Sequence, residues 1–396
     1  MRILSPAIAA AGHNSRKKQD DDASDLIVSV VQPALRSAKQ APLEATQHVI
    51  DMMAKEQQHV RNMPCQTHDE QHNGQIPTAS SIDLFVLPEL CPVGYSEDTF
   101  ANYLPTTQKL KQMFCEIDSC FAQAAQAMQA HICYGTIGWK ESTDSNKKEE
   151  YFIRQVVVDP QGRCVCHYDK IHLCNYGACA ETRFFTPGHT PTSFTIAKRS
   201  STLSSSSVPS WTLGIVVCAD MRYGRFAHRL AQGHGADIIL QPACFERDCS
   251  FRTWQPFRET RAVENGVYWL AGNYAGNDYG EASCSPPWID DDHEPAVLGR
   301  DETQLVVRLQ KRELYEARTD LPFYQHLQQG ACGCCYCGTN EDKKRNCSDT
   351  GQRKLQGAML WVERAFWILL LAILCRWNST DQAFLATAKE RLSNGM

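Results

Sequence analysis

The sequence of 396 residues predicts an α/β fold. Short apolar segments rich in β-branched residues, which are typical of buried strands, alternate along the chain with longer segments of helical periodicity. Alternation of this kind favours sheets whose faces are covered by helices. The contents of 43% hydrophobic and 21% charged residues are those of a globular protein with a substantial core.

The predicted elements follow one another between residues 26 and 327. The first strand is expected at residues 26 to 31, where β-branched residues fill the segment and Gln32-Pro33 ends it. A helix from residue 42 to about residue 59 follows. Further strands are expected at 84–87, 132–139, 151–158, 164–168, 213–217, 238–241 and 267–272, and further helices at 111–130, 221–233 and 254–265. The Asp-Pro-Gln-Gly turn at 159–162 makes a hairpin of two of these strands.

Four segments have compositions that do not fit a packed core. Residues 1 to 25 are polar and end near an acidic run, so we expect a disordered leader there. Residues 63 to 80, rich in Gln, His and Asn, and the Ser-rich residues 200 to 207 are expected to be surface loops. Residues 328 to 396 differ in composition from the rest and form a Cys-rich and apolar C-terminal appendix.

The appendix contains two notable runs. The apolar residues 365 to 375 would rise about 16 Å as a helix, whereas the hydrocarbon core of a membrane is about 30 Å thick. A packed or interfacial terminal helix is therefore favoured over membrane contact, and an irregular tail is a further alternative. The cluster Cys-Gly-Cys-Cys-Tyr-Cys at 332–337 leaves a zinc site, a lipidated segment and a tail without function as interpretations.

Charge and cysteine usage narrow the partners and the compartment. The formal net charge is −5 and the Lys and Arg residues are dispersed, so nucleic acid is not expected as a partner. The 19 cysteines are scattered through apolar, strand-like segments, and the chain is much longer than a disulfide-framed secreted domain. We therefore expect a reducing compartment, the cytoplasm, with a weak organelle-targeting signal at the N-terminus as the alternative.

Three segments place a reactive side chain directly after an apolar strand, where a rigid scaffold can hold it at the edge of a cleft. These side chains are Glu89, Lys170 and Cys218. Each has an ordinary structural explanation when taken alone, because carboxylates, amines and thiols often follow strands without any chemical role. A thiolate beside an ammonium and a carboxylate, however, is an activated nucleophile.

The order of these three residues and the short motifs around them are similar to those of a known family. Pro-Glu-Leu at 88–90, Asp-Lys-Ile-His-Leu at 169–173 and a Cys that ends an apolar strand resemble the carbon-nitrogen hydrolase (nitrilase-like) superfamily. The likeness extends over residues 26 to 327 and includes the segments 185–188, 235–242 and 260–268. It implies a four-layer α-β-β-α sandwich, a homodimer or larger homo-oligomer, and hydrolysis of a small-molecule amide or carbamoyl substrate by water without metal or organic cofactor.

The resemblance also implies a role for each site residue. Cys218 is expected as the nucleophile, Glu89 as the general base, and Lys170 as the stabiliser of the anionic intermediate, helped by the backbone N–H of Ala219. The ammonium is expected to lower the pKa of the thiol. Glu181 matches a second acidic position that orients the amine and the substrate, with an ordinary loop salt bridge as the alternative.

The residues after the nucleophile narrow the reaction. The small residue and the Asp that follow Cys218 favour amide hydrolysis, because family members that act on nitriles usually have Trp-Glu there. N-carbamoyl hydrolysis and nitrile hydrolysis remain alternatives, and a catalytically silent assembly subunit is the non-enzyme alternative. The usual Phe-Pro-Glu is replaced by Tyr-Gly-Arg at 223–225, which puts the start of the local helix in question.

Some neighbouring residues are candidates for substrate contacts. Tyr95 and Phe245 are expected to line the pocket, although a tight turn and core packing explain them equally well. A substrate carboxylate has three candidate partners, each of which also fits a structural role: Arg222, Arg247 and Arg252.

Overall fold

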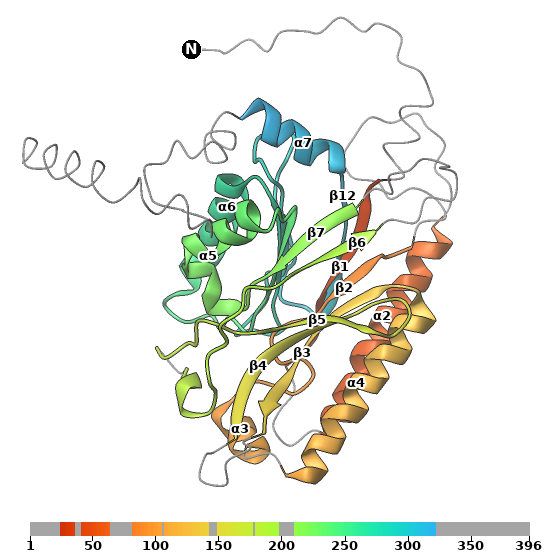
Figure 1. The fold of residues 1–396 in the computed structure, drawn as a ribbon. Helices are drawn as coiled ribbons and strands as arrows, with labels where there is room; N and C mark the ends of the chain where they lie inside the picture. The colour runs from red at the N-terminus through yellow and green to blue at the C-terminus, as the bar shows by residue number, and fades with distance from the viewer. Residues whose placement is uncertain are drawn as a thin grey trace, which may run out of the picture. The chain divides into compact units, whose positions relative to one another are not determined.

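The computed structural model describes residues 24–35, 41–63, 81–104, 107–141, 149–176, 179–197 and 210–321 (Figure 1). The chain divides into two units, Met1–Gln328 and Gln329–Met396, and every described residue belongs to the first. The expected leader at 1–25, the insert at 63–80, the Ser-rich loop at 200–207 and the appendix at 328–396 therefore lie wholly or almost wholly outside the described residues. Within the described ranges, no helix combines the length and the apolar character needed to cross a membrane.

Two six-stranded sheets form the centre of the described fold. The first has the strand order β12-β1-β2-β3-β4-β5, with the bounds Thr303–Leu309, Leu26–Gln32, Leu84–Val86, His131–Lys140, Glu150–Val158 and Cys164–Asp169. The second has the order β11-β10-β9-β8-β7-β6, with the bounds Ala296–Val297, Ser283–Ser285, Tyr268–Gly272, Ile238–Pro242, Ser210–Ile215 and Ser193–Ala197. Every residue of β1, β2, β8 and β9 is buried, which explains why these strands are almost continuously apolar in the sequence.

Helices cover both outer faces of the sheet pair (Figure 1). The helices α2 (Pro42–Asn62) and α4 (Gln108–Met128) lie on one side, and α5 (Gly224–His228) and α6 (Trp254–Asn265) lie on the other. The layers therefore follow the order α-β-β-α, and the predicted four-layer sandwich is confirmed. Two further helices, α3 (Glu97–Tyr103) and α7 (Lys311–Asp320), flank the sandwich.

The helix α4 shows how the sequence determines one of these layers. The Thr107 hydroxyl accepts a hydrogen bond from the backbone N–H of Leu110, which satisfies one of the free donors at the start of the helix. Its buried residues recur at helical spacing, and Phe121 stacks on Tyr134 of β3 with ring centroids 4.1 Å apart. Burial of this apolar face against β3 fixes the helix on the sheet.

The parallel pairing of the central strands places reactive residues at one edge. β2 pairs in parallel with β1 and β3, and β7 and β8 run parallel to each other in the second sheet. Within each sheet, the carboxyl ends of neighbouring parallel strands lie at the same edge, so the residues that follow such strands lie close together. Glu89 follows β2, Cys218 follows β7 and Cys244 follows β8.

The prediction of a helix starting at residue 221 is wrong, because the helix α5 begins at Gly224. The chain makes a short 3₁₀ turn at Cys218–Arg222 and leaves helical geometry at Tyr223, where φ is −100° and ψ is 84°. Only then does α5 begin, and Arg229–Gly233 continues it as a wider π turn. The sequence departs from the family pattern at 223–225, which is where the expected helix is interrupted.

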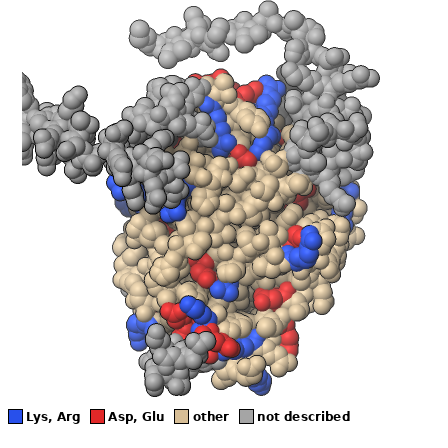
Figure 2. Space-filling view, in the orientation of Figure 1, with Lys and Arg blue, Asp and Glu red and all other residues tan. Residues whose placement is uncertain are grey.

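Acidic and basic side chains are interspersed on the face of the molecule seen in Figure 2. On that view Lys and Arg lie next to Asp and Glu in several places, rather than gathering in one continuous basic area. This distribution agrees with the small formal net charge of −5. It offers no ready track for a phosphate backbone on that face.

Candidate active site

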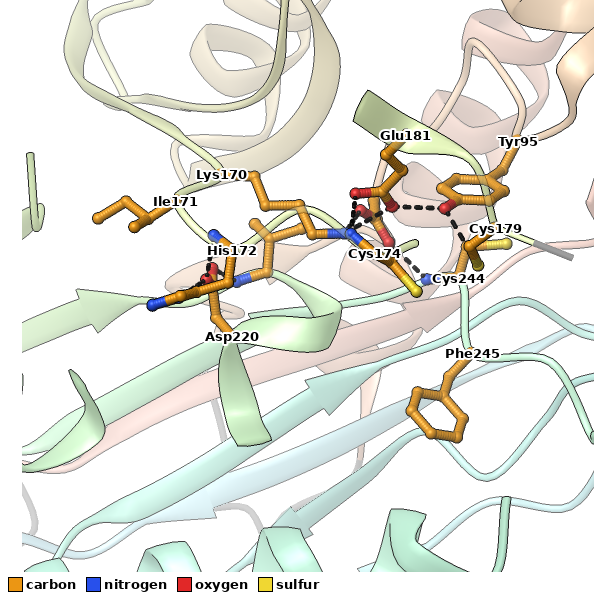
Figure 3. A network of polar contacts seen from close by, with 12 residues as sticks. Tyr95, Lys170, Ile171, His172, Cys174, Cys179, Glu181, Asp220, Cys244 and Phe245 are labelled. Carbon is orange, nitrogen blue, oxygen red and sulfur yellow. Dashed lines mark hydrogen bonds and ion pairs between the residues drawn. The ribbon is translucent and has the colours of Figure 1, made fainter. Parts of the chain in front are cut away.

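Three charged side chains from distant parts of the chain meet in the interior (Figure 3). The Lys170 Nζ lies 2.8 Å from Glu89 Oε1 and 2.8 Å from Glu181 Oε1, and all three side chains are fully buried. Such a group is costly to bury unless its charges are paired and hydrogen-bonded. The arrangement satisfies that condition, because the ammonium donates to both carboxylates.

A backbone N–H and a tyrosine hydroxyl hold Glu89 in place. Its Oε2 accepts a hydrogen bond from the N–H of Cys244 at 3.1 Å, and its carbonyl oxygen accepts one from the Tyr274 hydroxyl at 2.9 Å. The next residue, Leu90, has a positive φ of 53°, and a Cβ on Gly135 would lie 2.3 Å from its nitrogen. Only glycine at position 135 lets strand β3 approach this turn so closely.

Strand β5 ends immediately before Lys170, and both the N–H and the carbonyl of Lys170 are hydrogen-bonded to neighbouring segments. The Lys170 N–H donates to the carbonyl of Ile153 at 2.9 Å, and its own carbonyl accepts from the N–H of Gly188 at 2.8 Å. A Cβ on Gly188 would lie 2.1 Å from the carbonyl oxygen of Asp169, so the segment at 185–188 can pack here only with glycine at its end. These contacts aim the lysine side chain inward.

Glu181 is built into the same buried group. Its Oε2 accepts a hydrogen bond from the N–H of Cys174 at 2.7 Å, and its Oε1 accepts one from the Tyr95 hydroxyl. Tyr95 in turn stacks edge-to-face on Phe100, with centroids 5.3 Å apart. The structure thus brings Tyr95, Lys170 and Glu181 together, as Figure 3 shows.

Cys218 occupies a strained turn at the end of β7. Its φ is 46°, in the left-handed region that side chains other than glycine rarely adopt. Such strain costs of order 1–3 kcal/mol and persists only where the surroundings enforce it. The Cys218 residue is 7% exposed and lines a cavity of about 270 Å³, so the sulfur is sheltered but reachable.

Asp220 enforces this turn and joins it to the lysine segment. Its Oδ2 accepts hydrogen bonds from the Val217 N–H at 2.8 Å and from the Tyr168 hydroxyl at 2.7 Å. Its Oδ1 lies 3.0 Å from the His172 N–H and 2.6 Å from His172 Nδ1. The segments that carry Lys170 and Cys218 are therefore held by one buried carboxylate.

The cavity contains several of the expected residues and leaves others out. Tyr95 and Phe245 line it together with Cys218. Among the described residues, the other predicted site residues are buried and do not line the cavity: Glu89, Lys170, Glu181 and Ala219. Aromatic rings and thiols form most of its wall. Its charged lining residues are the carboxylates Glu97, Glu246 and Asp248.

The arginines considered as carboxylate partners do not line the cavity in the described part of the chain. The Arg222 guanidinium lies against the rings of Tyr176 and Phe245, 5.1 Å and 5.6 Å from their centroids. Arg247 pairs with Glu281 at 2.5 Å. None of the three arginines therefore lines the cavity directly in the described ranges, although Arg222 packs against two of its lining rings and has two buried nitrogens, Nε and Nη2, with no hydrogen-bond partner there.

Burial sets the proton positions in the group. Burial alone would lower the pKa of Lys170. The negative charges of Glu181 and Glu89 outweigh this effect of burial and raise the pKa well above its ordinary value. Burial also raises the pKa of Glu89 to about 7, although Lys170 opposes the rise. Lys170 therefore stays charged, and Glu89 exchanges its proton near neutral pH.

The thiol departs from the expectation. Burial raises the pKa of Cys218 well above its usual range, the charge of Glu89 adds to the rise, and Lys170 offsets only part of it. The ammonium acts in the expected direction, but desolvation outweighs it, so the prediction of a lowered pKa is wrong. Cys218 rests as a thiol, and the proton must leave when the sulfur attacks.

Sequence reasoning missed several residues that support this group. Cys244 and Tyr274 hold Glu89, Asp220 joins the two loops, and Cys174 donates to Glu181. Their contribution is largely through backbone groups or distant pairing, which residue type alone does not reveal. In the described ranges, no group of three or more His, Cys, Asp or Glu side chains is arranged to hold a metal ion.

Part of the chain is similar in sequence to known amidases. The chain is 25% identical over 203 residues to the deaminated glutathione amidase of Mus musculus, which covers 48% of this chain and 58% of the relative. It is 25% identical over 180 residues to an omega-amidase of Homo sapiens, covering 43% of this chain and 59% of the relative. The chain thus spans less than two thirds of the length of these relatives.

Solved structures share the fold. A nitrilase-superfamily protein of Saccharomyces cerevisiae superposes with a TM-score of 0.56 at 18% identity, covering 76% of this chain and 95% of that one. An amidase from Nesterenkonia sp. gives a TM-score of 0.53 at 19% identity, covering 76% and 96%. The carbon-nitrogen hydrolase sequence model matches residues 27–308, most of the chain. The chain therefore belongs to the carbon-nitrogen hydrolase family.

Proposed function

We propose that this protein hydrolyses the carbon–nitrogen bond of small-molecule amides through a thioester on Cys218. The observation that carries the proposal is the buried group of Glu89, Lys170 and Glu181 beside a cavity lined by Cys218. It combines a nucleophile, a base and a fixed cation at one water-poor site. The amidases among the relatives favour an amide over a nitrile as substrate.

The first step is attack by the sulfur of Cys218 on the amide carbon. Because the thiol and the carboxyl both have raised pKa values, the proton passes to Glu89 as the bond forms. Negative charge then develops on the amide oxygen. Lys170 and the backbone N–H of Ala219 are proposed to stabilise this oxygen, and Glu181 keeps the ammonium charged and oriented.

The second half of the reaction reverses the proton movement. Glu89 gives its proton to the departing ammonia or amine, which leaves an acyl group on Cys218. Glu89 then accepts a proton from water as that water attacks the thioester. The carboxylic acid leaves, and the thiol is restored with its proton.

A release assay tests the reaction type. Purified protein is offered primary amides, N-carbamoyl compounds and nitriles, with Cys218→Ala as the blank. The proposal predicts ammonia from amides alone. Ammonia together with carbon dioxide would favour N-carbamoyl hydrolysis, ammonia from a nitrile would favour a nitrilase, and no product above the blank would favour a silent assembly subunit.

We also propose a cytoplasmic homodimer. The 12 described cysteines, from Cys91 to Cys284, are all free thiols, which supports a reducing compartment. The dimer is proposed from the family alone. Light scattering at several protein concentrations tests it, and a mass equal to that of one chain throughout would contradict it.

A further inference from the structure

Four thiols line the same cavity, although the proposed reaction uses only one. They belong to Cys174, Cys179, Cys218 and Cys244. Cys174 and Cys179 lie near each other in the sequence, on the segment that joins Lys170 to Glu181. Neither thiol takes part in the proposed hydrolysis, so the reaction does not explain why both line the cavity beside the nucleophile.

Both of these cysteines contact the residues that hold Glu181. The N–H of Cys174 donates to Glu181 Oε2 at 2.7 Å, and the N–H of Glu181 donates back to the Cys174 carbonyl at 3.1 Å. The Tyr95 hydroxyl lies 3.6 Å from the Cys179 sulfur and also donates to Glu181. Figure 3 shows Tyr95, Cys174, Cys179 and Glu181 gathered at one place.

The two thiols also differ in reactivity. A hydrogen bond from the Cys179 thiol lowers the pKa of Cys174 to about 6, although burial opposes this change. This lowered pKa favours the thiolate form of Cys174, whereas the raised pKa of Cys218 favours its thiol form. Thiolates react with peroxides and thiols scarcely do, so an oxidant that enters the cavity meets its most reactive sulfur at Cys174.

We propose that Cys174 and Cys179 form a peroxide-sensitive pair whose disulfide reversibly inactivates the neighbouring site. The Cys174 thiolate attacks one oxygen of hydrogen peroxide, the O–O bond breaks, and a sulfenic acid and one water result once a solvent proton is taken up. The Cys179 sulfur then attacks the sulfenic sulfur, loses its proton and releases a second water. Two thiols and one peroxide thus give one disulfide and two waters.

The disulfide would act through Glu181. Bonding to Cys174 draws the Cys179 sulfur away from the Tyr95 hydroxyl and shifts the backbone of Cys174, which is the donor to Glu181 Oε2. A displaced Glu181 no longer orients the Lys170 ammonium. The nucleophile itself remains unmodified, so reduction restores the site.

The sequence makes this pair easy to detect. Trypsin cleaves after Lys170 and after Arg183, and the resulting peptide contains Cys174 and Cys179 as its only cysteines. The full chain is treated with hydrogen peroxide, free thiols are alkylated, and the digest is weighed. The proposal predicts a peptide lighter than its reduced form by two hydrogen atoms, unalkylated, and returned to two alkylated thiols by dithiothreitol.

Variants separate the pair from general oxidation. Cys179→Ser is expected to abolish the cross-link, and Cys249→Ser, which removes an exposed thiol, is expected to leave it intact. A peptide that keeps both thiols alkylatable while Cys218 is oxidised would overturn the proposal. Because the mass measurement needs no substrate, the result stands apart from the amidase proposal. Where an amide is hydrolysed, activity should fall with the cross-link and return on reduction.

Discussion

Replacing Lys170 with Ala removes the only cation that contacts the carboxylates of Glu89 and Glu181 within the described ranges. The loss of a donor to the developing oxyanion typically costs about 3–4 kcal/mol in the transition state, which is a factor of about 10²–10³ in rate. The charge of Lys170 also holds down the pKa of Glu89, which is already about 7. In the variant this pKa rises further, so less base is available at neutral pH.

The same change should weaken the fold. Removing one partner of a buried, hydrogen-bonded charge group typically costs about 3–5 kcal/mol of stability. Protonation of Glu89 relieves part of this cost, because the two carboxylates then carry one negative charge between them. Urea unfolding should therefore show a smaller loss of stability at low pH than at high pH.

The assay is ammonia release from the best amide in the panel, measured as kcat/KM across the pH range. Lys111→Ala is the matched control, because Lys111 also pairs with two glutamates, at 2.7 Å and 3.1 Å, but lies outside the cavity. We expect the control to keep its kcat/KM and Lys170→Ala to lose two to three orders of magnitude, about 10²–10³. A folded Lys170→Ala protein within about tenfold of the native rate would refute the reasoning.

Three further predictions concern the supporting residues. With a pKa of about 7 for Glu89, kcat/KM should rise as the pH increases through about 7. Burial raises this pKa from 4.5, so the stability that protonated Glu89 contributes is fully present below pH 4.5 and is lost as the pH rises through about 7. In urea titrations at high pH, Glu89→Gln should therefore be more stable relative to the native protein. Gly135→Ala should cost about 1–3 kcal/mol in the same titrations because its Cβ would meet the turn at 2.3 Å, whereas Gly299→Ala, with open space around it, should be neutral. Asp220→Asn should cost about 1–3 kcal/mol and lower kcat, because the amide keeps only one oxygen and leaves either the Val217 N–H and the Tyr168 hydroxyl or the His172 N–H without an acceptor. Native stability in Gly135→Ala or Asp220→Asn would count against the packing described.

Much of the fold could be predicted from the sequence, because each central strand is an almost continuously apolar segment that can be recognised without its neighbours. β1 and β8 were predictable from their β-branched residues alone, and α6 from its periodicity. β12 was not predicted, because most of its residues are only partly buried and it becomes a strand by pairing with β1, which lies far away in the chain. Pairing over such a distance leaves no local signal.

The candidate site was predictable to the extent that it depends on residue type and order. Glu89, Lys170 and Cys218 each lie within three residues of the end of a strand, although these strands belong to two different sheets and β5 runs antiparallel to β4. The sequence did not reveal that the Cys244 N–H holds Glu89, or that burial outweighs the ammonium and leaves Cys218 as a thiol. Both effects depend on three-dimensional surroundings rather than on the residues themselves.

The central claim is that Cys218 carries the acyl group of the substrate. Trypsin releases residues 200–222 as a peptide whose only cysteine is Cys218, so a hydrolysed amide can be mixed with the protein, quenched in acid during turnover and digested. This peptide is expected to gain the mass of the acyl group, and Cys218→Ala is expected neither to gain it nor to release ammonia. Turnover of the amide with this peptide unchanged, or with the acyl group on another residue, would contradict the account.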